Sequence, residues 1–166
     1  MFYYPDEYLD SVKDITIDLL NKNKIKALIL DVDNTIIDFD KKIPEGVEEW
    51  CENLKTQGIK LCIVSNSDKK EKVEMVANKL NLPYFYFATK PLKRGFKKAV
   101  KLLGEDNKNI ATVGDQIFTD VIGANRMHMF SILVKPIAKK DILITKIKRP
   151  LENFIINRYL KSIEKS

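Results

Sequence analysis

Short, almost continuously apolar runs alternate with stretches of helical periodicity through the middle of the chain. The apolar runs cover residues 26–31, 60–64, 84–87, 110–113 and 130–134. Runs of this length are typical of strands buried in a parallel sheet. Helical spacing fills residues 45–56, 69–80, a basic stretch after Pro91, and 121–126. This alternation predicts an α/β fold with a doubly wound, mostly parallel sheet.

Polar residues follow these runs at one kind of position, the carboxyl end of a predicted strand. Asp31-Val32-Asp33-Asn34-Thr35 comes directly after the first run, Ser65-Asn66 after the second, and Lys90 after the third. Asp115 and Asp120 follow the fourth run. In open α/β sheets the carboxyl ends of the strands border the ligand crevice, and unpaired buried carboxylates are costly. We therefore predict that these side chains form one site.

The residue types at these positions favour phosphoryl transfer. Carboxylates around one crevice repel each other unless a cation lies among them. Oxygen ligands too few to fill a coordination shell favour Mg²⁺, which keeps several waters and binds together with substrate phosphate. The Ser65 hydroxyl and the Lys90 ammonium are donors suited to phosphate oxygens. A carboxylate nucleophile, a metal, a lysine and a hydroxyl together predict a phosphoryl-transfer site.

Structural explanations exist for the same residues. Turns after strands and helix caps commonly use the residue types found at Asp31, Asp33, Ser65 and Asp115. Asp120 suits the first turn of a helix, where the macrodipole favours an acid. Lys90 is chosen by its position before Pro91 alone, because further basic residues follow closely. The ordered combination favours a site over a series of unrelated turns.

Composition and length indicate one domain over residues 1–166, because 166 residues with 45% hydrophobic content are enough for one core but hardly for two. No apolar run approaches the ~18 residues of a membrane-spanning helix, and no signal sequence is evident, so we expect a soluble cytoplasmic protein. Residues 135–166 hold nine basic and three acidic residues, which accounts for the net charge of +6. This basic segment, helical from Arg149 to about Ile163, suits an anionic partner or is simply a solvated face.

The motifs resemble those of the haloacid dehalogenase (HAD) superfamily, subclass III. They are Asp31-Val32-Asp33-Asn34-Thr35, Ile63-Val64-Ser65-Asn66, Lys90-Pro91 and Gly114-Asp115-Gln116-Ile117-Phe118-Thr119-Asp120, in order over about residues 25–135. More narrowly, the chain is similar to YqeG-like phosphatases and mitochondrial phosphatidylglycerophosphate phosphatases. The segments that add to this likeness are Pro5-Asp6-Glu7-Tyr8, Gly123-Ala124-Asn125-Arg126 and Val134-Lys135-Pro136-Ile137. The resemblance implies a single HAD-like Rossmannoid domain.

The resemblance also implies roles for the motif residues. Asp31 attacks phosphorus and becomes an aspartyl phosphate, and Asp33 protonates the leaving oxygen and then activates water. Mg²⁺ is held by the Asp31 and Asp115 side chains and the Asp33 main-chain carbonyl. The phosphoryl group is bound by Ser65, Asn66 and Lys90. Asp120 orients Lys90 or a metal-bound water.

The spacing between motifs bears on the substrate. There are 34 positions from Asp31 to Ser65 and 25 from Ser65 to Lys90, and each interval is filled by one helix and one strand. No room remains for the cap domain that covers small substrates in this superfamily. A small phosphorylated metabolite is an alternative substrate if a partner subunit supplies the lid. An open site suits a phosphate on a lipid headgroup, a polysaccharide or a macromolecule.

We therefore expect a Mg²⁺-dependent phosphomonoester hydrolase, acting on phosphatidylglycerophosphate on the basis of the resemblance. Peripheral contact of the basic C-terminal segment, about residues 139–166, with the inner face of a membrane fits this expectation. One alternative is a phosphatase for a soluble sugar phosphate or nucleotide. Another is a nucleic-acid or ribosome-associated binding protein that uses the basic segment, although the intact motifs and the lack of an aromatic RNA-binding signature argue against it.

Overall fold

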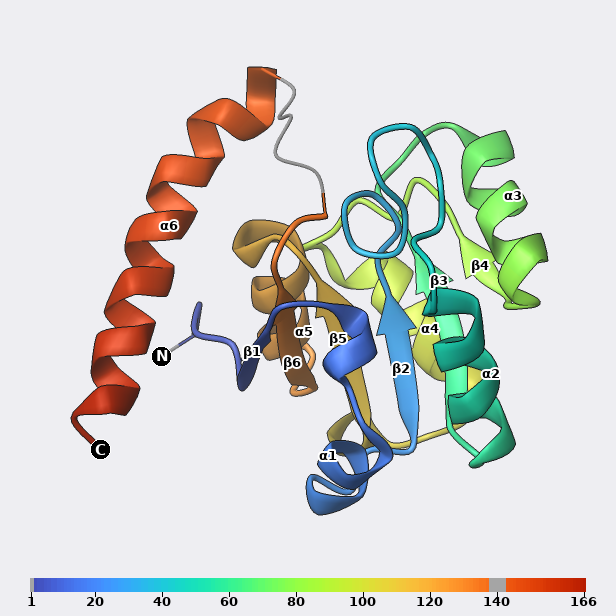
Figure 1. The fold of residues 1–166 in the computed structure, drawn as a ribbon, viewed down its shortest axis with the longest axis horizontal. Helices are drawn as coiled ribbons and strands as arrows, with labels where there is room; N and C mark the ends of the chain where they lie inside the picture. The colour runs from blue at the N-terminus through green and yellow to red at the C-terminus, as the bar shows by residue number, and fades with distance from the viewer. Residues whose placement is uncertain (1, 138–142) are drawn as a thin grey trace.

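A six-stranded parallel sheet forms the centre of the structure, a computed structural model that describes residues 2–137 and 143–166. The strands lie in the order β1-β6-β5-β2-β3-β4 (Figure 1). Their bounds are β1 (Glu7–Leu9), β2 (Ala27–Leu30), β3 (Lys60–Val64), β4 (Tyr84–Phe85), β5 (Ile110–Gly114) and β6 (Phe130–Val134). Because every pairing is parallel, the carboxyl ends of the strands meet at one edge of the sheet.

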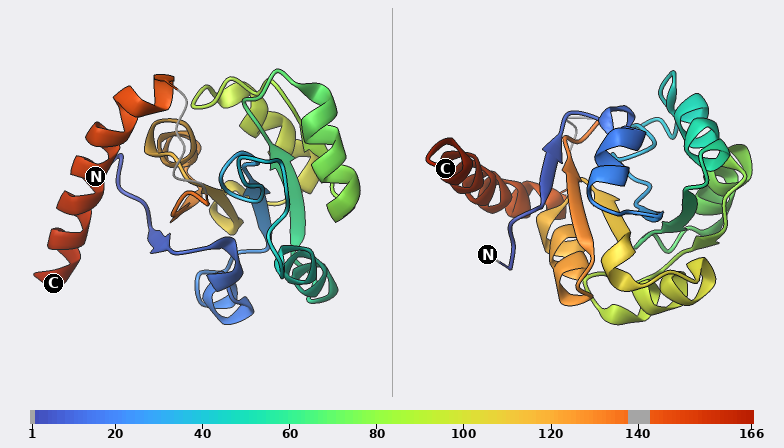
Figure 2. Two further views of the ribbon diagram at one scale, coloured as in Figure 1. Left: turned by 45° about the horizontal axis from the view of Figure 1, so that its top comes forward. Right: turned by 90° about the horizontal axis from the view of Figure 1, so that it is seen from below.

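Helices cover both faces of the sheet (Figure 2). The first face, which carries Leu28 and Leu30, packs against α1 (Ile17–Lys22), α2 (Val47–Thr56) and α3 (Lys70–Leu80). The second face, which carries Ile29, packs against α4 (Lys93–Leu103) and α5 (Ile122–Arg126). Successive strand residues point to opposite faces, so one apolar run supplies both core layers.

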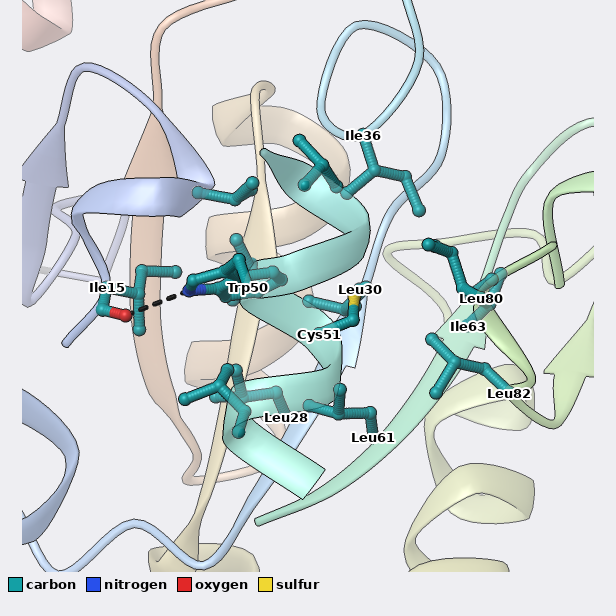
Figure 3. Packing of buried hydrophobic residues seen from close by; sticks show 14 of the residues in the cluster. Ile15, Leu28, Leu30, Ile36, Trp50, Cys51, Leu61, Ile63, Leu80 and Leu82 are labelled. Carbon is teal, nitrogen blue, oxygen red and sulfur yellow. Dashed lines mark hydrogen bonds between the residues drawn. The ribbon is translucent and has the colours of Figure 1, made fainter. Parts of the chain in front are cut away.

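Trp50 is the centre of the packing on the first face (Figure 3). Its ring lies among the buried aliphatic side chains, and its indole N–H donates a hydrogen bond of 2.9 Å to the carbonyl oxygen of Ile15. A buried indole donor without a partner is costly, and this bond satisfies it. The contact ties α2 to the chain that precedes α1.

Several elements differ from the sequence prediction, and one of them is α1, a six-residue helix that was not predicted. β1 was not predicted, because three residues at a sheet edge give too short a pattern, although Glu7 pairs with Ile132. β4 ends at Phe85 instead of residue 87, since Phe87 adopts a positive φ of 48° that turns the chain. α6 (Leu143–Glu164) begins six residues before the predicted Arg149 and contains Pro150 in its interior.

No folded cap is inserted near the carboxyl edge in the stretches between 31 and 46 and between 65 and 69, which the structure describes as loops. α6 lies beyond β1, on the side of the sheet away from β4 (Figures 1 and 2). Its Ile155 and Ile156 pack on Ile117, Val121 and Leu133, and Tyr159 contacts the ring of Tyr4. Among the described residues, no helix is both long and apolar enough to cross a membrane.

Candidate active site at the carboxyl ends of the strands

A buried lysine joins two of the predicted site carboxylates. The Lys90 Nζ lies 2.9 Å from the Asp31 Oδ1 and 2.7 Å from the Asp120 Oδ1. Only 2% of the Lys90 side chain is exposed. Burial lowers the pKa of Lys90, but Asp120 and Asp31 raise it by more, so the net pKa is above the usual lysine value. The structure therefore places a permanent positive charge beside Asp31.

Asn66 fixes the main chain of this lysine. Its side-chain amide donates a hydrogen bond of 2.9 Å to the carbonyl oxygen of Lys90, and its Oδ1 accepts one of 2.6 Å from the Lys90 N–H. These two bonds hold the end of β3 against the residue that precedes Pro91. Asn66, predicted to bind substrate, thus also supports Lys90 from the neighbouring strand end.

Asp120 reaches the site through a π-helical turn over Ile117–Val121. Its Oδ2 accepts a hydrogen bond of 3.3 Å from the Gln116 N–H. A Cβ atom at Gly114 would lie 2.1 Å from the Asp120 carboxyl group, so only glycine allows this close approach. The glycine of the fourth motif therefore makes room for the carboxylate six positions later.

Asp115 is buried at the end of β5 and is held from two directions. The Thr35 hydroxyl donates to its Oδ1 at 3.3 Å. From α6, the Arg149 Nη2 forms an ion pair with its Oδ2, and the Arg149 Nη1 donates to its main-chain oxygen at 2.7 Å. Sequence reasoning missed Arg149 and its neighbour Glu152, because only the basic charge of the segment marked this region.

Asp33 and Ser65 have partners other than the buried carboxylates around Lys90. Asp33 is half-exposed, and both its oxygens accept from the Lys72 Nζ of α3, at 2.7 and 2.9 Å. Ser65 is buried at the end of β3, where its Oγ accepts from the Ser67 N–H at 3.1 Å. Its own hydroxyl hydrogen is still available for donation. The wall of the pocket at this strand end is formed by Asn66 and Ser67.

A pocket of about 430 Å³ opens above these residues. Its lining contains acids, amides and several lysines, contributed by the loops after β2, β3, β4 and β5 and by the start of α3. The lining residues are Asp31, Asp33, Asn34, Asp38, Phe39, Lys41, Asn66, Ser67, Lys69, Lys72, Lys90, Gln116 and Thr119. Of the site residues predicted from sequence, Asp31, Asp33, Asn66 and Lys90 line this cavity, whereas Ser65, Asp115 and Asp120 are not among its lining residues.

The carboxylates of this site carry more negative charge than their neighbours neutralise. One oxygen each from Asp31, Asp115 and Asp120 lies within 4.8 Å of the others. The pKa of Asp31 is raised to about 6, first by burial and then by Asp120, against the lowering effect of Lys90. The pKa of Asp115 is raised to about 7, by burial and then by Asp31. A hard divalent cation relieves such repulsion, so the donor set fits Mg²⁺.

Comparisons of the sequence with known proteins identify phosphatase relatives. The sequence model of a family described as mitochondrial PGP phosphatase matches residues 2–138. The probable phosphatase YqeG of Bacillus subtilis is 35% identical over 157 residues, which are 94% of this chain and 91% of that protein. A mitochondrial phosphatidylglycerophosphatase of Saccharomyces cerevisiae is 31% identical over 150 residues, 80% of each protein.

Solved structures share the fold. An uncharacterized protein from Listeria monocytogenes matches with a TM-score of 0.56 and 18% identity, over 72% of this chain and 86% of that one. A haloacid dehalogenase-like hydrolase from Brucella suis matches with a TM-score of 0.54 and 10% identity, over 75% and 92%. The predicted α/β fold with a parallel sheet is confirmed.

Proposed function

This chain belongs to the mitochondrial PGP phosphatase family and is a phosphoric monoester hydrolase of the HAD superfamily, and from that premise we propose that it hydrolyses phosphatidylglycerophosphate to phosphatidylglycerol with Mg²⁺. The observation that carries the proposal is the buried Lys90 ammonium between Asp31 and Asp120. It holds the nucleophilic carboxylate at the pocket and adds a positive charge where a transferring phosphoryl group needs one.

In the proposed reaction two aspartates divide the chemistry. An Asp31 oxygen forms a bond to phosphorus while the bond from phosphorus to the phosphatidylglycerol oxygen breaks. Asp33 gives a proton to that oxygen, and then takes a proton from the water that hydrolyses the aspartyl phosphate. The half-exposed position of Asp33 in the pocket lining suits contact with a leaving group, and Lys72 on both its oxygens limits its rotation.

We propose that Mg²⁺ is held by the side chains of Asp31 and Asp115 and by the main-chain carbonyl of Asp33. When bound, the ion neutralises the charge of the carboxylates and of the phosphoryl oxygens. Three residues are proposed to bind the phosphoryl group, namely Ser65, Asn66 and Lys90. The available hydroxyl hydrogen of Ser65 and the buried ammonium of Lys90 support this assignment.

The pocket also suits a substrate larger than its phosphate. Three lysines line it besides Lys90, namely Lys41, Lys69 and Lys72, and Phe39 presents an exposed ring at the same pocket. Phosphatidylglycerophosphate carries a phosphodiester close to its phosphomonoester, and lysines suit this second anion. The loops at the carboxyl edge contain no folded cap in the described residues, so the pocket is open to a headgroup presented at a lipid surface.

Peripheral contact with the cytoplasmic face of a membrane is proposed for α6. Its described residues expose Leu151 and Phe154, and the Arg158 guanidinium lies 5.9 Å from the centre of the Phe154 ring. Apolar and basic side chains together favour the surface of anionic lipid, at ~1 kcal/mol per basic residue. The start of the predicted basic segment, residues 139–142, lies outside the described residues.

Sedimentation with anionic vesicles tests this contact. Binding is expected to fall steeply between about 0.1 M and about 1 M salt, because the Debye length shortens from ~10 Å to ~3 Å. Replacing Phe154 with Ser should weaken the binding that remains. Binding that is equally strong at both salt concentrations contradicts an electrostatic contact.

Phosphate release from phosphatidylglycerophosphate in mixed micelles tests the proposed substrate. Turnover is expected with Mg²⁺ and is expected to stop when EDTA removes the ion, because the buried carboxylates then repel the phosphate. The comparison is a panel of soluble sugar phosphates and nucleotides under the same conditions. Faster turnover of a soluble ester than of the lipid contradicts the substrate and leaves the phosphatase chemistry standing.

A further inference from the structure

The C-terminal helix reaches the candidate metal centre through one arginine. The Arg149 Nη2 pairs with the Asp115 Oδ2, and the Arg149 Nη1 donates to the Asp115 main-chain oxygen at 2.7 Å. Two nitrogens of one guanidinium therefore hold the side chain and the main chain of the same residue. This contact joins residues 34 positions apart in sequence, and Arg149 lies beyond the residues that the family model matches.

A buried acid holds the arginine in turn. The Glu152 Oε2 accepts from the Arg149 Nη1 at 3.1 Å, and the Glu152 Oε1 accepts from the Phe118 N–H at 3.3 Å. The side chains of Arg149 and Glu152 are only 12% and 2% exposed. Glu152 thus bridges α6 to the turn that carries Asp120.

Docking of the helix does not by itself account for this polar cluster. Ile155 and Ile156 already pack α6 on the core with apolar contacts. Burying an arginine and a glutamate is costly, and apolar residues of similar size often stabilise a fold as well or better. The location of the cluster, directly on a carboxylate proposed to hold a metal, indicates a functional use.

We propose that Arg149 is a positioning residue of the metal centre, which fixes the Asp115 carboxylate for Mg²⁺, and that Glu152 orients Arg149. This inference rests on the proposed Mg²⁺ dependence. Arg149 holds Oδ2 of Asp115, and Oδ1, which accepts from the Thr35 hydroxyl at 3.3 Å, keeps a further lone pair for a metal. Carboxylates that ligate metals are commonly hydrogen-bonded in this way. α6 thereby completes a site whose other residues all precede residue 121.

The planar fork of arginine explains why this residue type is needed. A guanidinium offers two nitrogens in fixed geometry, so it can bind Oδ2 and the main-chain oxygen of Asp115 at once. A lysine has the same charge on a single nitrogen and loses this geometry. Replacing Arg149 with Lys should therefore retain the charge and restore only part of the effect.

Magnesium titration by calorimetry tests the proposal on the folded protein. Arg149→Met is expected to weaken Mg²⁺ binding by about 10–100-fold, the usual effect of removing a group that supports a metal ligand. Arg149→Lys should fall between this variant and the unaltered protein. Arg94→Met makes the same change at an exposed position of α4 and is expected to bind Mg²⁺ normally.

Thermal melting with EDTA separates positioning from stability. A merely structural arginine lowers the melting temperature of Arg149→Met but leaves the Mg²⁺ affinity of the folded protein unchanged, and that result overturns the proposal. Tighter Mg²⁺ binding also overturns it, because the guanidinium then competes with the ion.

If Arg149→Met does not fold, the Glu152→Gln variant provides the test. Its Mg²⁺ affinity should be weakened by less than that expected for Arg149→Met, and an unchanged affinity overturns the proposal. No Mg²⁺ binding by the unaltered protein instead overturns the proposed Mg²⁺ dependence.

Discussion

Phosphate release by the Asp31→Asn variant is expected to fall by a factor on the order of 10⁴ to 10⁶, the range found when single members of a protease catalytic triad are removed. Asparagine keeps the size of the side chain but lacks the nucleophilic carboxylate oxygen, so the covalent step is lost. Steady-state turnover of phosphatidylglycerophosphate, with Mg²⁺ at saturation, measures the effect.

Folding of this variant is expected to be intact. The pKa of Asp31 is raised to about 6, chiefly by burial, so a neutral amide at this position removes an unfavourable buried charge at neutral pH. Asp40→Asn is a matched control, because it makes the same change at an exposed position of the loop after β2. Substantial turnover by Asp31→Asn, with Asp40→Asn active, contradicts the assignment of the nucleophile.

Lys90→Met is expected to affect both stability and catalysis. It leaves Asp31 and Asp120 buried without their shared cation, which typically costs about 3–5 kcal/mol of unfolding free energy. Loss of the charge beside the phosphoryl group is expected to lower turnover by about 10²–10³-fold. Urea unfolding in EDTA and turnover with Mg²⁺ measure the two effects separately.

The stability loss depends on pH in a defined direction. Loss of Lys90 raises the pKa of both carboxyls further, so the difference from the unaltered protein grows as pH rises through the Asp31 pKa of about 6. At acid pH both carboxyls are protonated and need no cation, so the two proteins converge. Lys98→Met, an exposed change on the α4 helix that follows Lys90, is expected to be as stable as the unaltered protein at every pH. Equal unfolding midpoints for Lys90→Met and Lys98→Met near neutral pH contradict the buried ion pairs.

The strands and the residues at their ends could be predicted because both follow from local patterns. An apolar run marks a buried strand, and parallel strands place their carboxyl ends at one edge. Asp31, Lys90, Asp115 and Asp120 therefore meet although up to 89 positions separate them in sequence. The spacing of the motifs also predicted that no folded cap is inserted between these strands. In the structure, the stretches between 31 and 46 and between 65 and 69 are loops.

Contacts between distant elements could not be predicted in this way. The pairing of Lys72 with Asp33, and of Arg149 with Asp115, depends on how helices α3 and α6 pack, and helical periodicity does not set that orientation. The C-terminal helix was predicted to begin at Arg149, yet it begins at Leu143 and contains Pro150 in its interior. The burial of Glu152 likewise contradicts the expectation that a charged residue in a basic helix faces water.

The most direct test of the proposed chemistry is mass spectrometry of the peptide that contains Asp31 after acid quenching during turnover of phosphatidylglycerophosphate. The account predicts a gain of one phosphate on Asp31, formed at least as fast as phosphate is released and absent from the Asp31→Asn variant. Rapid phosphate release with no phosphate on Asp31, or with phosphate on another residue, contradicts it.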